Sequence, residues 1–271
     1  MKSTLLSVAF FALAASGVAS GGRTPIGARS LAMGGTSVAL SDLWSAGNNQ
    51  AGMAWLKGFC AGIGMENHFL LKELNREQFA LCLPMKTGSF GLVLTNFGNS
   101  AYGEIKAGFS YARKLGRNFA AALQLDYLRI HQCSDYGNRN LASCEIGLMY
   151  RAGSRLTLGL QLVNPVPVRI TRHPPETLPA VMCFGMTWRF SDNFLLSAEA
   201  EKDLEHPLRI RTGAEYRVAK PAHARIGFAT APLILTFGFG LQFGRFTVDA
   251  ASGYHQALGF SPALTICYGL N

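Results

Sequence analysis

The sequence predicts an all-β protein: a transmembrane, antiparallel, up-and-down β-barrel of about 14 strands with an N-terminal hatch or plug in its lumen. The 271 residues are 49% hydrophobic and only 15% charged, against about 25% charged in a typical soluble domain. No apolar run approaches the roughly 18 to 20 residues that a spanning helix needs. From Phe59 onward, side chains alternate with a period of two. Because every backbone polar group inside a bilayer needs a partner, these features together favour a closed barrel.

Residues 1–20 resemble a Sec signal peptide. Lys2 supplies a positive start, Leu5–Ala15 form an apolar stretch, and Val18-Ala19-Ser20 offer small residues for cleavage. We therefore expect export to the outer membrane of a Gram-negative bacterium. No cysteine directly follows the apolar stretch, so a lipoprotein is not expected.

The next predicted unit, residues 21–57, is the hatch. It does not alternate, it is rich in Gly, Ala and Ser, and it carries apolar patches at Leu31-Ala32-Met33 and Val38-Ala39-Leu40. A barrel of this strand number would leave an open lumen if its own side chains alone had to close it. We therefore expect this segment inside the barrel; a tail on the periplasmic side is the alternative.

Residues 58–271 are the predicted barrel. One clear strand sets Met182, Phe184 and Met186 against Cys183 and Gly185, which is the half-and-half pattern of a barrel wall. The expected strand centres are Ile63, Leu81, Leu92, Ala107, Leu123, Ile146, Leu160, Phe184, Ala198, Ala214, Gly227, Phe239, Ala250 and Ile266.

The connections between these strands alternate in length. Short turns such as Lys86-Thr87-Gly88 and Gly244-Arg245 contrast with long connections at Gln132–Asn140 and Pro165–Pro179. Outer-membrane barrels have short periplasmic turns and longer outer loops, so the N-terminus is expected on the periplasmic side. Aromatic residues at outward positions near the short turns predict an interfacial girdle. A soluble β-sandwich would alternate too, but it would not gather aromatics at every second strand end.

Charged residues at inward positions predict a lumen charge ladder. Its members are Glu199, Glu201, Arg209, Arg211, Glu215, Arg217 and Arg225. Folding two strands about Glu205 sets Glu199 opposite Arg211 and Glu201 opposite Arg209, as favourable cross-strand pairs. We expect this ladder to stiffen the wall and hold the hatch. A selective ion path is the alternative, although mixed signs do not build a single-sign filter.

Six cysteines in an exported chain allow disulfides. Cys133 and Cys144 bracket one outer loop and are the best local pair; Cys60 could meet Cys82 or Cys267. Buried free thiols are the alternative. The chain has no C-x-x-C motif, so no metal site is expected.

The partners expected from charge are lipids. Arginine side chains in the outer loops suit lipopolysaccharide phosphates, but a solvated rim is the favoured interpretation of these basic residues. They are Lys72, Arg76, Arg139, Arg169 and Arg172. The formal net charge is +9, but the basic residues are dispersed and no groove-reading motif occurs, so no nucleic-acid partner is expected. The chain contains no G-x-S-x-G, H-E-x-x-H or Walker loop. We expect a non-enzyme without cofactor.

A resemblance to a known family rests on the segment before the first strand. Gly27-Ala28-Arg29-Ser30-Leu31-Ala32-Met33-Gly34-Gly35-Thr36-Ser37-Val38-Ala39 and the following Asp42-Leu43-Trp44-Ser45-Ala46 are similar to the hatch signature of the FadL/PorV/PorQ-like outer-membrane family. Asn48-Asn49-Gln50-Ala51-Gly52-Met53-Ala54 continue the match, with Gln50 where the family usually has proline.

The resemblance implies a fourteen-stranded barrel whose hatch uses Arg29, Ser30, Met33, Gly34, Gly35, Asp42, Asn48, Asn49 and Gly52. It implies one of two functions. The first is a PorV/PorQ-like role in protein secretion or surface presentation by the type IX route, with secretion-machinery or exported cargo proteins as partners. The alternative is FadL-like passive transport of a small hydrophobic ligand across the outer membrane. Short outer loops favour the first.

Overall fold

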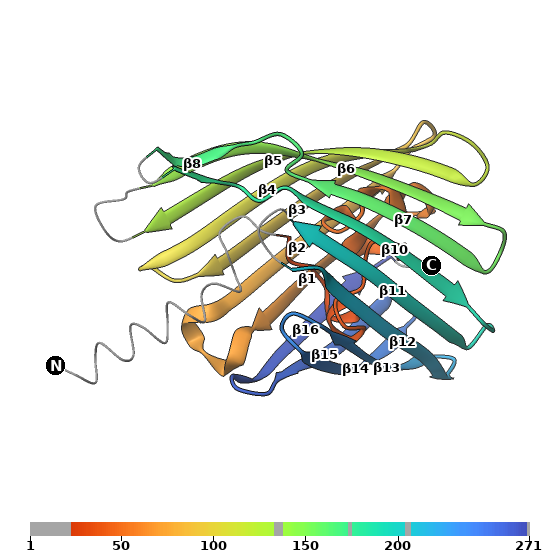
Figure 1. Cartoon of the computed structure of the whole chain (residues 1–271). Coiled ribbons are helices and arrows are strands. Elements are labelled where there is room, and N and C mark those ends of the chain that lie inside the picture. Colours follow the sequence, from red (N-terminus) through yellow and green to blue (C-terminus); the bar gives the residue numbers. More distant parts are fainter. Residues whose placement is uncertain (1–22, 133–137, 173–174, 204–206, 270–271) are drawn as a thin grey trace.

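The computed structural model describes residues 23–132, 138–172, 175–203 and 207–269, so the predicted signal peptide lies outside it. These residues form a closed antiparallel barrel (Figure 1). In chain order, its strands are β1 (Cys60–Asn67), β2 (Asn75–Pro84), β3 (Ser89–Gly98), β4 (Tyr102–Lys114), β5 (Phe119–Gln132), β6 (Arg139–Ala152), β7 (Leu156–Val163), β10 (Val181–Arg189), β11 (Phe194–Asp203), β12 (Arg209–Ala219), β13 (Ala222–Ala229), β14 (Ile234–Phe243), β15 (Phe246–His255) and β16 (Gly259–Tyr268).

The barrel closes where the first strand meets the last, with Ala61 opposite Tyr268 and Glu66 opposite Ala263. The predicted fold class is confirmed, and each of the fourteen expected strand centres falls within one of these strands. The alternation explains why. Phe237 and Phe239 of β14 point outward and are exposed, whereas Gly238 between them is buried against the interior.

The outer wall is therefore apolar. Ile226, Phe239 and Phe243 are each at least 60% exposed, which a water-facing surface would avoid and a lipid-facing surface requires. None of the helices in the described part of the chain is long and apolar enough to cross a membrane.

The connections differ between the two ends of the barrel. Short turns follow β2, β4, β6, β10, β12 and β14 at one end, here called the short-turn end. The other, long-connection end carries η3 (His68–Leu70), η4 (Lys72–Leu74) and a hairpin of β8 (Arg169–Arg172) and β9 (Pro175–Thr177). The sequence pattern did not predict this hairpin, because its strands are too short to show a period.

Residues 23–56, here called the luminal segment, run inside the ring of strands (Figure 1). The segment contains α2 (Ala28–Ala32), η1 (Leu43–Ala46) and η2 (Gln50–Trp55). Most of its apolar side chains are buried, among them Met33, Leu43, Trp44 and Met53, whereas Leu31, Ala54, Trp55 and Leu56 are partly buried. The hydrophobic core thus lies between the luminal segment and the inner face of the wall.

Candidate functional site

Arg23 anchors the start of the luminal segment to the wall. Its Nη1 lies 2.6 Å from Glu199 Oε1 and 2.9 Å from Glu201 Oε2 on β11. Its Nε donates to Gln161 Oε1 of β7 at 2.9 Å, and its Nη2 donates to Ser37 Oγ. Sequence reasoning missed Arg23, because a single charge in a segment without periodicity gives no directional signal.

Glu199 does more than meet Arg23. Its Oε2 accepts the backbone N–H groups of Ser37 at 2.8 Å and Val38 at 2.9 Å. The strand register sets Glu199 opposite Arg211 and Glu201 opposite Arg209, as the ladder predicted. Among the described ion pairs, however, Arg211 meets Glu201 at 2.9 Å, and Glu199 is instead taken up by the luminal segment. Arg209, the predicted partner of Glu201, lies 3.5 Å from Glu201 Oε1. The direct neighbours of Glu199 come from the luminal segment, which has no strand register from which they could be predicted.

Arg29 forms a second anchor. Its Nε and Nη2 donate to the two carboxylate oxygens of Glu215 on β12 at 2.8 and 2.7 Å, and its Nη1 lies 3.0 Å from Asp42 Oδ2. Arg225 bridges Glu215 at 2.7 Å and Asp249 at 2.6 Å. Burial by itself would lower the pKa of Arg29, but Glu215 and then Asp42 outweigh it, so the pKa is raised. The guanidinium stays charged within this cluster.

The asparagines of the segment hold its backbone. Asn48 accepts the N–H of Ile26 at 2.9 Å and donates to its carbonyl at 3.0 Å. Asn49 donates to the carbonyl oxygens of Val38 at 2.7 Å and of Leu148 on β6 at 3.0 Å. These two side chains therefore fix the fold of the segment and its contact with the wall.

Gln50 stands where the resembled family has proline. Its Nε2 donates to Glu145 Oε2 on β6 at 2.7 Å, and Gln161 Nε2 donates to the same oxygen at 2.9 Å. Proline could make neither a side-chain nor a backbone donation here. The departure from the family pattern thus adds a bond between segment and wall.

The remaining predicted hatch residues shape the turns of the segment. Gly34 and Gly35 have positive φ, at 72° and 81°, which suits glycine. The N–H of Gly34 donates to Thr236 Oγ1 at 2.8 Å. Ser30, Met33 and Gly52 are buried within the segment. Asp42 caps η1 in a reciprocal arrangement with Ser45.

Glycines on the inner face of the wall let the segment approach the strand backbones. A Cβ atom on Gly213 of β12 would lie 2.5 Å from Met33 Cβ, and one on Gly238 of β14 would lie 2.7 Å from Ala32 Cβ. On the opposite side, a Cβ on Gly91 of β3 would lie 2.6 Å from Met53 Sδ. At this level the segment packs against the wall itself.

Two pockets lie on opposite sides of the luminal segment. The pocket toward the short-turn end has a volume of about 260 Å³ and a charged lining that includes Arg29, Glu215, Arg217 and His223. Arg217, predicted as part of the ladder, is exposed at this mouth. The pocket toward the long-connection end has a volume of about 80 Å³, below the roughly 300 to 1,000 Å³ of ordinary small-molecule sites.

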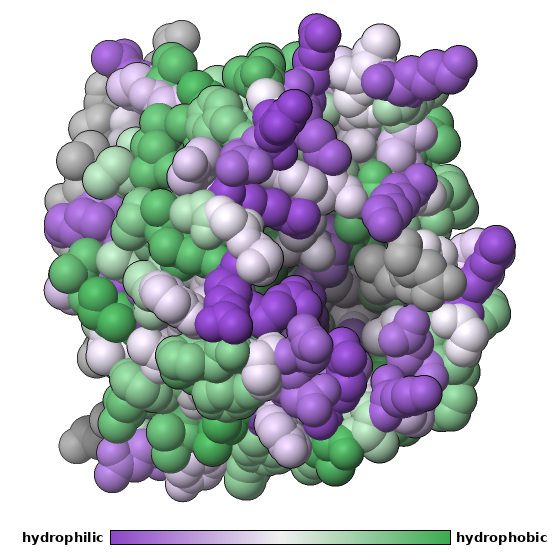
Figure 2. Space-filling model, turned by 90° about the vertical axis from the view of Figure 1, so that its right-hand side faces the viewer, coloured by the Kyte–Doolittle hydropathy of each residue, from purple (hydrophilic) through white to green (hydrophobic). Residues whose placement is uncertain are grey.

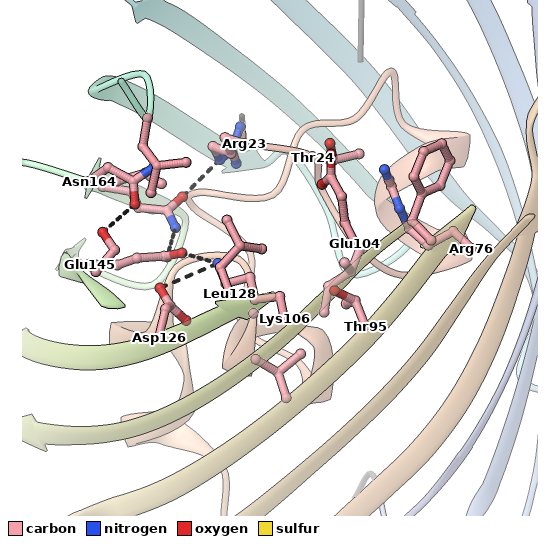
Figure 3. Close-up of a pocket in the computed structure, with 18 residues that line it drawn as sticks. Arg23, Thr24, Arg76, Thr95, Glu104, Lys106, Asp126, Leu128, Glu145 and Asn164 are labelled. Atoms are coloured by element: carbon pink, nitrogen blue, oxygen red, sulfur yellow. Dashed lines mark hydrogen bonds and ion pairs between the residues drawn. The ribbon is translucent and has the colours of Figure 1, made fainter. Parts of the chain in front are cut away.

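This second pocket, here called the outer pocket, has walls of two kinds (Figure 3). Its apolar lining comes from the segment and from the upper parts of several strands, with Ile26, Val93, Phe97, Leu128, Val163 and Leu178. Next to it, Leu128 and Ile130 of β5 pack with Ile170 and Leu178 of the long connection around the hairpin. One side of the barrel interior, along β5, is therefore apolar toward the long-connection end.

The polar lining of the outer pocket is a compact charge cluster. Lys106 Nζ contacts Glu145 Oε1 and lies 3.4 Å from Asp126 Oδ2, and Figure 3 shows these three side chains converging from neighbouring strands. Arg76 lies over the Phe97 ring, 5.2 Å from its centroid, and 3.7 Å from Glu66. The three cations of this lining, Arg23, Arg76 and Lys106, each have an acidic neighbour, whereas Glu104 accepts a hydrogen bond from the Tyr102 hydroxyl.

Within the described residues, one group of cysteine and acidic side chains is spaced so that it could hold a metal ion. Cys183, Glu199 and Glu201 bring ligand atoms within 4.8 Å of one another, but the Arg23 guanidinium already bonds to both carboxylates. Cys60, Cys82 and Cys267 are free thiols, although Cys60 and Cys82 are direct register partners. The predicted Cys133–Cys144 pair involves Cys133, which lies outside the described residues.

Comparisons with solved structures find the same barrel fold in other proteins. No family model and no curated protein matches the sequence. The Ralstonia pickettii toluene transporter TbuX matches with a TM-score of 0.70 at 15% identity, over 92% of this chain and 99% of that one. The CymD monoaromatic hydrocarbon channel matches with a TM-score of 0.71 at 13% identity, over 92% and 98% of the two chains. A Pseudomonas aeruginosa FadL homologue matches with a TM-score of 0.71 at 13% identity, over 90% and 98%. The chain therefore shares the barrel fold of these FadL-type proteins over nearly its whole length.

Proposed function

We propose that the chain is an outer-membrane barrel that lets small hydrophobic molecules cross passively, with its short-turn end toward the periplasm. The observation that carries this proposal is the apolar lining of the outer pocket, at the end that would face the outside. Leu128 and Ile130 occupy inward positions directly above the polar Gln124 and Asp126 of the same strand. A water-filled porin would keep a polar lining there. The likeness to barrels described as toluene and monoaromatic hydrocarbon transporters supports the same function.

In this proposal the luminal segment is the gate. The outer pocket, at about 80 Å³, is too small for most ligands. Beneath it, the luminal segment packs against glycine positions of the inner wall. Passage therefore needs a rearrangement of the segment. In this proposal a second exit for the hydrophobic molecule leads sideways through the wall. An apolar groove of about 600 Å³ lies on the lipid side of β12–β16, with Gly213 and Gly227 in its floor. Met33 of the luminal segment lies directly behind Gly213.

The test is uptake by whole cells, because the lipopolysaccharide layer of intact cells is the barrier that such a barrel would bypass. Cells without other hydrocarbon channels would express the chain, and uptake of radiolabelled toluene would be followed. We expect faster uptake than in cells with an empty vector. Leu128→Asp, which places a charge in the apolar pocket wall, should remove most of the gain. Leu128→Met is the matched control: it keeps the pocket wall apolar and should retain uptake.

Equal toluene uptake with and without the barrel, at confirmed surface expression, would overturn the proposal. The competing PorV/PorQ-like role in type IX secretion finds no support in the comparisons, whose structures are described as transporters and channels. Co-purification separates the two functions: the tagged barrel should come without stoichiometric secretion proteins.

A further inference from the structure

The short-turn end of the barrel carries charge of almost one sign. Each of its six turns has a lysine or arginine in it or directly before it, and these exposed side chains, here called the basic rim, are Lys86, Arg117, Arg155, Arg189, Lys220 and Arg245. Asp192 is the one acidic residue in these six turns, all of which lie in the described part of the chain. Figure 2 views the barrel from this end and shows long hydrophilic side chains around a hollowed centre.

The opposite end does not share this bias. There, five exposed basic residues (Lys72, Arg129, Arg139, Arg169 and Lys202) are accompanied by exposed Glu73 and Glu77. The formal net charge of +9 is thus not spread evenly over the two ends.

The basic rim lies at the edge of the lipid-facing surface. Arg245 Nη1 lies 3.4 Å from the hydroxyl of Tyr268, whose ring packs 5.1 Å from that of Phe246. Beside Arg189, the rings of Trp188 and Phe190 are 6.0 Å apart on the outward face. Aromatic residues of this kind mark the depth of lipid headgroups. Arg245 and Arg189 therefore lie at that depth.

We propose that the basic rim binds the phosphate groups of anionic phospholipids in the periplasmic leaflet of the outer membrane. The inference rests on the membrane placement in the proposed function. Arginine and lysine suit phosphate oxygens, and each such residue near an anionic bilayer surface strengthens binding by about five-fold. An acidic protein partner would need its contacts on one side. The even distribution over six turns instead matches a ring of lipid.

The experiment measures which lipids stay on the full chain. Purified protein in detergent micelles would receive equimolar phosphatidylglycerol and phosphatidylethanolamine, and native mass spectrometry would count bound lipids. A variant with Lys86, Arg117, Arg155 and Lys220 changed to Gln neutralises four rim residues. The matched control changes Lys72, Arg129, Arg139 and Arg169 to Gln, which removes the same charge from the other end.

We expect severalfold enrichment of phosphatidylglycerol on the native chain and on the control, and little or none on the rim variant. Equal retention of both lipids by the native chain, or equal loss in both variants, would overturn the proposal. So would an acidic protein that co-purifies through the same four residues while lipid selectivity is absent. Toluene uptake by cells reports the proposed function separately, because it does not depend on which lipid the rim prefers.

Discussion

Arg29 of the luminal segment binds both carboxylate oxygens of Glu215 on β12, at 2.8 and 2.7 Å. Arg225 approaches the same carboxylate from β13, so one acidic group neutralises two buried cations. We predict that Glu215→Gln loosens the segment more than Arg29→Gln does, because it leaves two guanidinium groups short of a partner. Breaking a buried ion pair by removing one member costs about 3–5 kcal/mol. Hydrogen exchange of the amides of residues 29–37 measures the effect.

The control for this prediction is the double variant Arg29→Gln/Glu215→Gln. It should protect those amides better than the two separate losses added together, since the Arg29 guanidinium is no longer present without the Glu215 carboxylate. Strictly additive losses would show that the two side chains act independently.

The glycines of the inner wall give a second prediction. Gly213→Ala would place a Cβ 2.5 Å from the Cβ and carbonyl oxygen of Met33, so the segment would have to move away from β12. Overpacking of this kind costs about 1–3 kcal/mol. Gly116→Ala is the matched control, because its Cβ would meet nothing within 4 Å. Urea unfolding of the refolded barrel should show a lower midpoint for Gly213→Ala alone; equal midpoints would contradict the close packing.

The strands of the barrel wall could be predicted from the sequence, whereas the contacts of the luminal segment could not, for a physical reason. Each wall strand has lipid on one side and the interior on the other, so residues such as Phe237 and Gly238 alternate and the pattern can be read along the chain. The luminal segment has wall on all sides and shows no period. Its contacts, such as Arg23 with Glu199 or Gln50 with Glu145, join residues far apart in sequence. The missing alternation, the open lumen and the family resemblance pointed to the segment, but none of them could assign those partners.

His68, in η3 at the long-connection end, predicts a pH dependence. Burial lowers its pKa below the ordinary 6.5; Glu66, 3.6 Å away, opposes the shift and Arg76 adds to it. The unfolded chain therefore binds a proton at a higher pH than the folded chain. The free energy of unfolding should fall as the pH drops from above 6.5 to below the pKa of His68 in the folded chain. At still lower pH, His68 causes no further loss of stability. Unfolding midpoints at pH 8 and pH 5 should differ less in His68→Gln than in the native chain; an unchanged difference would exclude His68 as a source.

Movement of the luminal segment can be tested by fixing it to the wall. A Cβ on Gly185 of β10 would lie 3.3 Å from Val38 Cβ, close to the roughly 3.5–4.5 Å of a disulfide. Val38→Cys with Gly185→Cys, in a chain whose native cysteines are changed to serine, should therefore form a bond under oxidising conditions. We predict that cells with the oxidised barrel take up toluene no faster than cells without the barrel. A reductant should restore uptake, because the luminal segment can then leave the wall. Each single cysteine variant, which cannot form the bond, controls for the substitutions themselves. Unimpaired uptake by the fully oxidised form would mean that hydrophobic molecules pass beside a stationary segment, for example by a sideways route that needs no displacement at Val38.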